Sequence, residues 1–409
     1  MLVDPQTHSL KARLRRVERV RKLRAVALIA PLFLFLLITF VIPIGSMMGL
    51  SIENPEVASV LPRTTDAIVD WDGIGIPDED ILAAFMADLS DGREARTLGR
   101  AAKRLNYEIS GFRSLLLKTA RKLPAAPSES RAAALIDIDE RWAEPIYWAA
   151  IKRASPAYTD SYLLAALDRT RNLEGEITLA PENQRMYVDV IGRTFWISLV
   201  VMLVCLVLGF PLAYLLASLP TSRSNLLLIL VLLPFWTSLL VRTTAWVVLL
   251  QSQGVVNDLA VFIGLWSERV QLIHNRTGVY IAMVHILLPF MVLPIYSVMK
   301  GISPTHMKAA ASLGAGPVRA FLKIYLPQTT PGVGAGCLLV FILSLGYYIT
   351  PALVGGPKDQ MLSYFIAFFT NETLNWGMAA ALSVILLALA LALFGVYNRL
   401  VGIDRLRMN

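Results

Sequence analysis

The sequence predicts an all-α membrane protein with six transmembrane helices and a large helical segment inserted between the first two. Two observations carry this prediction. Of the 409 residues, 56% are hydrophobic and only 17% are charged, whereas an average soluble domain is about a quarter charged. The apolar residues are also gathered into six long stretches instead of being spread along the chain. This composition argues against an ordinary soluble enzyme, and it excludes a disordered chain, which needs low hydrophobicity.

Each of the six stretches is long enough to cross a bilayer, which takes about 20 apolar residues. They are residues 25–50, 195–219, 226–250, 279–299, 333–353 and 378–400. The alternative is a set of buried helices in a soluble core, but such helices are typically shorter and keep a polar face. A cleaved signal peptide is the alternative for the first stretch. Its 26 residues exceed the roughly 7–15 apolar residues of a signal peptide, so we expect an uncleaved anchor helix.

Positive charges orient the predicted helices. Eight Lys and Arg residues precede the first stretch, within residues 1–24, and such charges mark cytoplasmic segments. If the helices alternate from there, the cytoplasmic segments carry 16 Lys and Arg, and the short opposite loops carry three. We therefore expect residues 1–24 and 401–409 to be cytoplasmic. The net charge of +8 then reports topology and does not indicate a nucleic-acid partner.

Residues 51–190, called the insertion below, differ from the rest of the chain. They contain 17 basic and 23 acidic residues, and the alternation of helices places them outside the cytoplasm. No alternating strand pattern is present, and helices are expected over residues 77–92, 96–122, 130–142, 145–153 and 158–173. Two interpretations stay open. The insertion is either a helical cap that only packs on the membrane part or a docking surface for an extracytoplasmic partner.

The loop between the fourth and fifth helices, residues 300–331, has the most informative local pattern. Pro304 can begin a short helix that ends at Leu313, and Gly314 permits a turn with positive φ. A second short helix is expected from Pro317 to just before Pro327. Small alanine side chains in such a helix–turn–helix would let a groove of another protein approach closely. The alternative is an ordinary amphipathic loop at the membrane surface.

This loop resembles the permease motif of bacterial ABC importers, which reads Glu-Ala-Ala, three residues, Gly, nine residues and Ile-x-Leu-Pro. The matching positions are Lys308, Ala309, Ala310, Gly314, Ile324, Leu326 and Pro327. Lys308 stands where the family usually has Glu, which puts in doubt any polar contact made by that Glu. The resemblance implies a type I ABC importer permease fold in a bacterial inner membrane. It also implies that residues 300–331 are the coupling loop, seated in a cleft of an ATP-hydrolysing subunit.

The same resemblance implies several partners. These are a pair of ATPase subunits, which would bind the ATP and Mg²⁺ that this chain does not bind itself, and an extracytoplasmic solute-binding protein. A second permease subunit is also implied. We expect it to be a homologue in a heterodimer, although a copy of this chain is the alternative.

Further segments resemble the spermidine/putrescine branch of these permeases. They are residues 234–246, 288–296 and 346–356. The resemblance implies a polyamine or a related small solute, leaves the exact solute open, and does not extend to the insertion. The polar and aromatic residues of these segments are the candidates for lining the translocation pathway: Trp236, Arg242, Thr243, Trp246, Tyr296 and Tyr347.

Arg242 is an ionisable residue within a predicted transmembrane helix, where charges are costly and usually face a cavity or a partner. A gating role and snorkelling of its side chain to the outer surface both stay open. The sequence has no GxxxxGK[ST] loop, no nucleophile–base pair and no metal-ligand spacing, so we expect a transport subunit without an enzymatic or metal site. The alternative function is an ion-gradient-driven secondary transporter. That class favours buried acidic residues near mid-membrane, and helices two to six contain no Asp or Glu.

Overall fold

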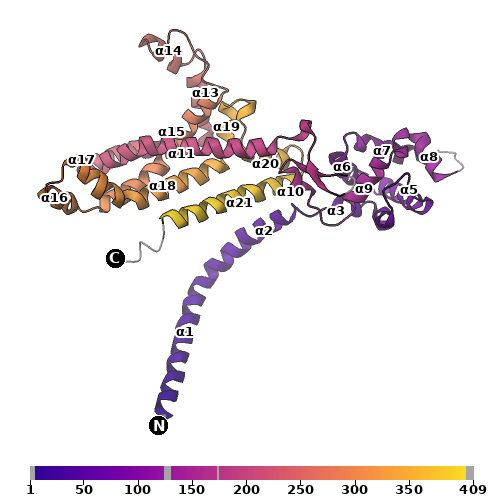
Figure 1. Ribbon diagram of the computed structural model, residues 1–409, viewed down its shortest axis with the longest axis horizontal. Helices are drawn as coiled ribbons and strands as arrows, with labels where there is room; N and C mark the ends of the chain where they lie inside the picture. The colour runs from indigo at the N-terminus through magenta and orange to yellow at the C-terminus, as the bar shows by residue number, and fades with distance from the viewer. Residues whose placement is uncertain (1–4, 124–129, 173–174, 402–409) are drawn as a thin grey trace.

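The computed structural model describes residues 5–123, 130–172 and 175–401, and it is almost entirely helical (Figure 1). Three long helices, α11 (Tyr187–Ser218), α15 (Arg276–Gly301) and α18 (Leu326–Gly346), pack side by side as a central bundle. The insertion lies at one end of this bundle, and residues 304–325 lie at the other end (Figure 1). The predicted all-α fold is confirmed.

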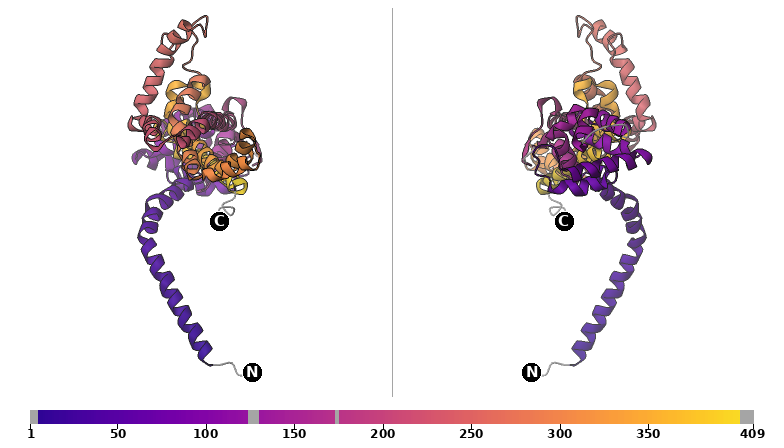
Figure 2. Two further views of the ribbon diagram at one scale, coloured as in Figure 1. Left: turned by 90° about the vertical axis from the view of Figure 1, so that its left-hand side faces the viewer. Right: turned by 90° about the vertical axis from the view of Figure 1, so that its right-hand side faces the viewer.

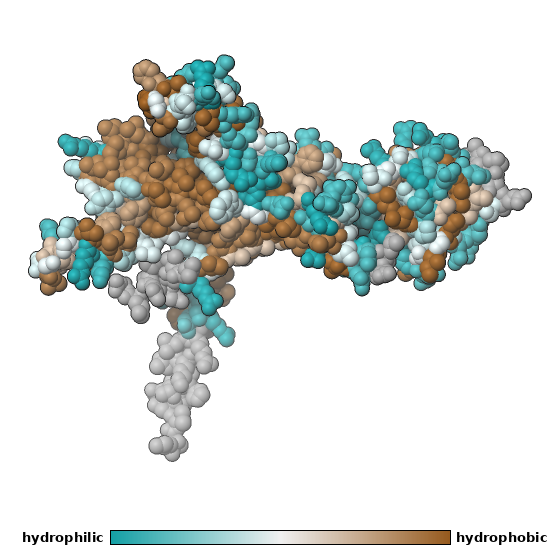
Figure 3. Space-filling view, turned by 45° about the horizontal axis from the view of Figure 1, so that its top comes forward, coloured by the Kyte–Doolittle hydropathy of each residue, from teal (hydrophilic) through white to brown (hydrophobic). Residues whose placement is uncertain are grey.

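The apolar helices match the prediction of a polytopic membrane protein. Within the described residues, five helical segments are long and apolar enough to cross a membrane: Val17–Gly49, Tyr187–Ser218, Arg276–Gly301, Pro317–Gly346 and Trp376–Arg399. A sixth span is formed if Thr221–Trp236 and Leu239–Leu250 are counted together, although they meet at 96°. Apolar residues cover much of the bundle surface, whereas polar residues dominate the insertion (Figure 3).

The anchor helix is continuous but not uniform. It comprises α1 (Pro5–Leu36), a π-helical turn over Leu37–Val41 and α2 (Ile42–Gly49). It meets the bundle where α2 packs against α21 (Trp376–Val401). From there α1 leaves the bundle on one side, and α13 (Leu239–Leu250) leaves it on the opposite side (Figure 2).

Two of the predicted transmembrane helices are broken. The stretch 226–250 divides into α12 (Thr221–Leu232), a 3-10 turn over Leu233–Trp236, and α13. The break follows because Pro234 lacks an N–H for the helical hydrogen bonds and Thr237 is extended. The stretch 333–353 breaks after Gly346, where Tyr347 is extended, and continues as the short helix α19 (Ile349–Val354).

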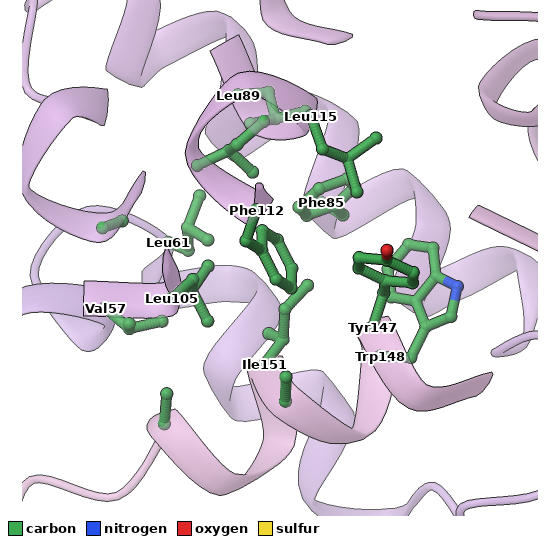
Figure 4. Packing of buried hydrophobic residues seen from close by; sticks show 14 of the residues in the cluster. Val57, Leu61, Phe85, Leu89, Leu105, Phe112, Leu115, Tyr147, Trp148 and Ile151 are labelled. Atoms are coloured by element: carbon green, nitrogen blue, oxygen red, sulfur yellow. The ribbon is translucent and has the colours of Figure 1, made fainter. Parts of the chain in front are cut away.

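The insertion folds around its own hydrophobic core. The helices that surround this core are α3 (Pro55–Ala58), α4 (Pro62–Ala67), α5 (Glu79–Glu94), α6 (Leu98–Glu108), α7 (Phe112–Lys122), α8 (Arg131–Ile138) and α9 (Pro145–Ala154). Phe85 lies edge-on to Trp142 and Trp148, with ring centroids 5.0 and 5.1 Å apart, beside Phe112 and Tyr147 (Figure 4). Both indole N–H groups are satisfied, because Trp142 donates to Thr119 Oγ1 at 2.8 Å and Trp148 donates to the Trp142 carbonyl at 2.9 Å.

Three of the helix predictions for the insertion are wrong. The helix expected over residues 130–142 ends at Ile138, because Asp139 is extended, and a 3-10 turn over Glu140–Ala143 follows. The single helix over residues 96–122 is divided into α6 and α7 at Gly111, whose φ of +88° is a conformation that glycine adopts readily. The helix over residues 158–173 is replaced by α10 (Ser161–Ala165) and an antiparallel hairpin of β1 (Arg169–Arg171) with β2 (Ile177–Leu179). These strands are short and largely exposed, so they carry no alternating pattern. The expected helix end at Leu173 lies outside the described residues, as do residues 402–409.

Acidification below about pH 4 is expected to destabilise the insertion through Asp139. Arg141 and Lys118 donate to this carboxylate at 2.8–2.9 Å, and these hydrogen bonds hold the pKa of Asp139 well below its usual range. The stabilisation is therefore complete above the unfolded-state pKa of about 3.9 and is lost as the pH falls from there toward the folded-state pKa. Thermal unfolding of the full chain between pH 3 and 7, followed by tryptophan fluorescence, measures this loss of stability.

The variant Asp139→Asn should lower the free energy of unfolding by about 1–3 kcal/mol near neutral pH and flatten the acid dependence. Asp137→Asn is the matched control, because Asp137 is exposed two residues earlier. Identical pH curves for wild type and Asp139→Asn would contradict this account.

Candidate functional site

The coupling loop contains a helix with a well-defined end. α16 (Pro304–Ser312) begins after Ser303, whose Oγ accepts the Thr305 N–H at 3.3 Å. At its end, the Gly314 N–H donates to the Ala311 carbonyl and the Ala315 N–H donates to the Ala310 carbonyl, both at 3.0 Å. This pair of bonds is a Schellman motif, which requires a left-handed residue, and Gly314 has φ +81°. The turn expected at Gly314 is therefore present.

The second half of the coupling loop runs directly into the fifth long helix. α17 (Pro317–Ala320) is followed by a π-helical turn over Phe321–Tyr325, and α18 begins at Leu326. The prediction that the second short helix ends before Pro327 is wrong. α18 follows the π-helical turn directly, and the helix continues through Pro327. The segment Pro317–Gly346 is consequently continuous.

The motif residues of the coupling loop divide into a packed set and an exposed set. The motif residue Ala310 is 3% exposed, as is Ala320 outside the motif, and α16 contacts α17. Lys308 and Ala309 are exposed, and no ion pair of Lys308 occurs among the described residues. Lysine in place of the usual Glu therefore leaves the internal packing of the loop unchanged.

The coupling loop also presents large apolar side chains to solvent. Leu313 is 88% exposed, Val318 70% and Leu322 53%. Ile324 is half-buried at the junction with α18. Exposed apolar groups gathered at one end of a bundle are typical of a protein–protein contact surface.

Several of the pathway candidates meet where α13, α15 and α19 approach one another. The Trp246 indole N–H donates to His285 Nδ1 at 3.1 Å, and the two rings lie edge-on. Thr243 is fully buried, and its Oγ1 lies 3.2 Å from Thr350 Oγ1. His285 and Thr350 were not among the candidates from the sequence, because their partners lie 39 and 107 residues away.

Arg242 belongs to the same neighbourhood, since its charge lies within electrostatic reach of His285 and Tyr347. Its Nε is buried and has no hydrogen-bond partner among the described residues. The other two candidates lie elsewhere. Trp236 is 89% exposed at the break between α12 and α13, and the Tyr296 hydroxyl lies 3.4 Å from Ser224 Oγ on α12.

Two of the acidic residues on the short outer loops of the membrane part are engaged in ion pairs. Asp258 pairs with Arg269 at 2.7 Å, and Asp359 pairs with Arg276 at 3.0 Å. Within the described residues, no group of three or more His, Cys, Asp or Glu side chains is placed to hold a metal ion.

A bundle of long apolar helices with an exposed helix–turn–helix at one end defines a polytopic membrane transport subunit. Residues 206–402 match the family described as the binding-protein-dependent transport system inner membrane component. The chain belongs to this family of inner-membrane ABC importer permeases. The insertion precedes the matched region.

Curated relatives support the same family assignment. The chain is 34% identical over 220 residues to the spermidine/putrescine transport system permease protein PotB of Salmonella typhimurium, covering 53% of this chain and 77% of the relative. It is 35% identical over 201 residues to PotB of Escherichia coli, covering 49% and 73%. It is 31% identical over 247 residues to the inner membrane ABC transporter permease protein YdcU of Escherichia coli, covering 55% and 77%.

One solved structure with a similar chain is a bacterial alginate ABC transporter in complex with an alginate pentasaccharide-bound periplasmic protein. The similarity has a TM-score of 0.45 at 19% identity and covers 53% of this chain and 78% of that chain.

Proposed function

We propose that this chain imports polyamines such as spermidine and putrescine, driven by ATP hydrolysis in partner ATPase subunits that bind ATP and Mg²⁺. The observation that carries the proposal is the coupling loop, a rigid turn with exposed apolar side chains at one end of the bundle. The relatives named for spermidine and putrescine transport support the choice of solute. The other proposed partners are a second permease subunit, in a heterodimer, and an extracytoplasmic solute-binding protein.

The fold offers a direct route from the coupling loop to the transmembrane helices. α16 follows α15 after two residues, and α17 continues into α18. Both long helices pack against α11 and against each other. A displacement of the loop by an ATPase subunit would therefore tilt α15 and α18 together, which changes access to the space beside them.

In the proposed topology the coupling loop and both termini face the cytoplasm, and the insertion faces outward. The opposite positions of the loop and the insertion along the bundle (Figure 1) support this orientation, as does the excess of Lys and Arg on the predicted cytoplasmic side.

The cluster around Trp246 supplies the proposed contact with the solute. An indole ring attracts an ammonium group over its face, and Trp246 is partly exposed. Arg242 would repel a polyamine at close range. We therefore assign Arg242 a gating role, in which its Nε, unpaired within the part of the chain that the structure describes, binds an acceptor in one of the two access states.

Uptake of labelled putrescine into proteoliposomes that contain the chain and its partners tests this proposal. We expect uptake to require ATP on the ATPase side and the solute-binding protein, and to be reduced more than tenfold by excess spermidine. Uptake without ATP that follows an imposed ion gradient would contradict it and favour a secondary transporter. ATP-driven uptake that spermidine does not reduce would contradict the choice of solute alone.

A further inference from the structure

A cavity of about 920 Å³ lies where the insertion meets the membrane helices. We call it the junction cavity. Its walls come from α6, α9, α10 and β1, from the start of α11, and from the ends of α20 (Leu362–Asn371) and α21. Its volume is within the range of about 300–1,000 Å³ that is usual for small-molecule sites.

The two sides of the junction cavity are fixed to one another. Lys103 of α6 donates to the carbonyls of Thr373 and Leu374, between α20 and α21, at 2.5 and 3.1 Å. The Tyr162 ring packs so closely on Gly377 that a Cβ there would lie 2.4 Å from it. The cavity is therefore formed without a ligand, and binding need not order its walls.

Cationic side chains are concentrated in the junction cavity, although the insertion as a whole is acidic. Four arginines line it against two acidic residues: Arg104, Arg153, Arg169 and Arg171 against Glu108 and Asp160. Arg104 and Arg153 share Glu108, and Arg171 pairs with Asp160. Arg169 has no ion pair among the described residues. The lining is thus net positive, which attracts anions and repels polyamines.

Arg104 is the most deeply placed of these cations. It is 2% exposed, its Nε donates to Asn54 Oδ1 at 2.7 Å, and its Nη1 donates to Glu108 at 2.9 Å. Its Nη2 is buried and has no hydrogen-bond partner among the described residues. An unsatisfied buried donor is costly, and native structures rarely leave one unexplained. Arg104 lines the cavity, so an acceptor group that reached Nη2 from the cavity would remove that cost.

Aromatic rings supply an apolar wall for the same cavity. Tyr107, Tyr162 and Phe369 line it, and the Arg104 guanidinium lies 5.3 Å from the centre of the Tyr162 ring. Burial raises the pKa of Tyr162 to about 12, so its hydroxyl stays neutral and adds no negative charge.

We propose that the junction cavity binds a small anionic molecule whose carboxylate or phosphate group lies between Arg104 and Arg169. The apolar part of the ligand packs against the rings of Tyr107, Tyr162 and Phe369. A ligand there would touch both the insertion and the outer ends of α20 and α21, so its occupancy would strengthen their attachment. This site is separate from the polyamine pathway, because the cluster around Trp246 contributes nothing to its lining.

Calorimetric titration of the purified full-length chain with phenyl phosphate tests the site. We expect saturable binding that weakens with salt, a higher unfolding temperature in its presence, and no competition by putrescine. Arg169→Gln and Arg104→Gln should each weaken binding at least tenfold. Arg169 is exposed, so its variant keeps the fold even if the buried Arg104 variant does not. Arg113→Gln is the control, because Arg113 is exposed on the insertion and does not line the cavity.

A second titration distinguishes a soluble anion from a lipid headgroup. The chain is placed in phosphatidylcholine nanodiscs with or without phosphatidylglycerol. Weaker phenyl phosphate binding when phosphatidylglycerol is present supports the site and assigns it to a lipid phosphate, and unchanged binding supports it for a soluble anion. Absence of saturable binding, equal affinity of wild type and Arg169→Gln, or binding of putrescine in place of phenyl phosphate would overturn the proposal. No outcome depends on transport, so failure here leaves the polyamine proposal standing.

Discussion

The variant Gly314→Val is expected to reduce ATP-driven uptake more than tenfold while the chain stays folded. Gly314 has φ +81°, and a Cβ added there meets nothing within 4 Å. The cost is therefore backbone strain, about 1–2 kcal/mol for an ordinary residue in this conformation and more for a β-branched one. When the chain relieves that strain, the two hydrogen bonds of the Schellman motif break, and the direction of α16 relative to α17 changes. Uptake and ATPase rates of the reconstituted complex measure the effect, and we expect hydrolysis to become uncoupled from uptake.

Gly316→Val is the matched control for this prediction. Gly316 lies two residues further along the same loop, its φ is −64°, and a Cβ there also meets nothing within 4 Å. This variant should retain most of the wild-type uptake. Gly314→Asn should fall between the two, because Asn tolerates the left-handed conformation. Equal losses at both glycines would show that the turn geometry is irrelevant, and full activity of Gly314→Val would contradict the coupling assignment.

The variant Gly332→Leu is expected to prevent stable packing of α15 against α18. A Cβ at Gly332 would lie 2.8 Å from the Pro294 carbonyl oxygen and 3.0 Å from Val298 Cβ. The Pro294 carbonyl oxygen belongs to the backbone, so no side-chain rotation can move it away. Close approach of membrane helices through small residues is a general means of association in lipid. Overpacking of this kind typically costs about 1–3 kcal/mol, occasionally more, so we expect a sharply lower yield and unfolding temperature in detergent.

Gly395→Leu on α21 is the control, because a Cβ there meets nothing within 4 Å. It should express and unfold like the wild type. If Gly332→Leu behaved in the same way, α15 and α18 would not pack as closely as the structure has them.

The features that could be predicted from the sequence are those with a local signal. Long apolar runs identify the membrane helices, because the requirement to span a bilayer is a requirement on consecutive residues. The turn at Gly314 could be predicted because glycine after an alanine-rich helix has few other roles. The break in the third helix could not, since Pro234 in an apolar run is equally compatible with a kink.

The features that could not be predicted depend on residues far apart in the chain. His285 becomes a partner of Trp246 only when α13 crosses α15, and no local pattern marks that crossing. The junction cavity joins Arg104 to Phe369 and Asn375, which lie far later in the sequence. The hairpin of β1 and β2 could not be predicted, because each strand has only three residues and these are largely exposed, which leaves no period to detect.

Cross-linking of the coupling loop to the ATPase subunit tests the central claim most directly. Cys205 and Cys337 are first replaced by Ser, and a single cysteine is introduced by Leu313→Cys, at a side chain that is 88% exposed. The control is Ile74→Cys, at a side chain of the insertion that is 78% exposed. Our account predicts that Leu313→Cys cross-links to the ATPase subunit with a yield that changes when ATP binds, and that Ile74→Cys does not cross-link to it. Cross-linking through Ile74→Cys and none through Leu313→Cys would contradict both the coupling loop and the proposed orientation.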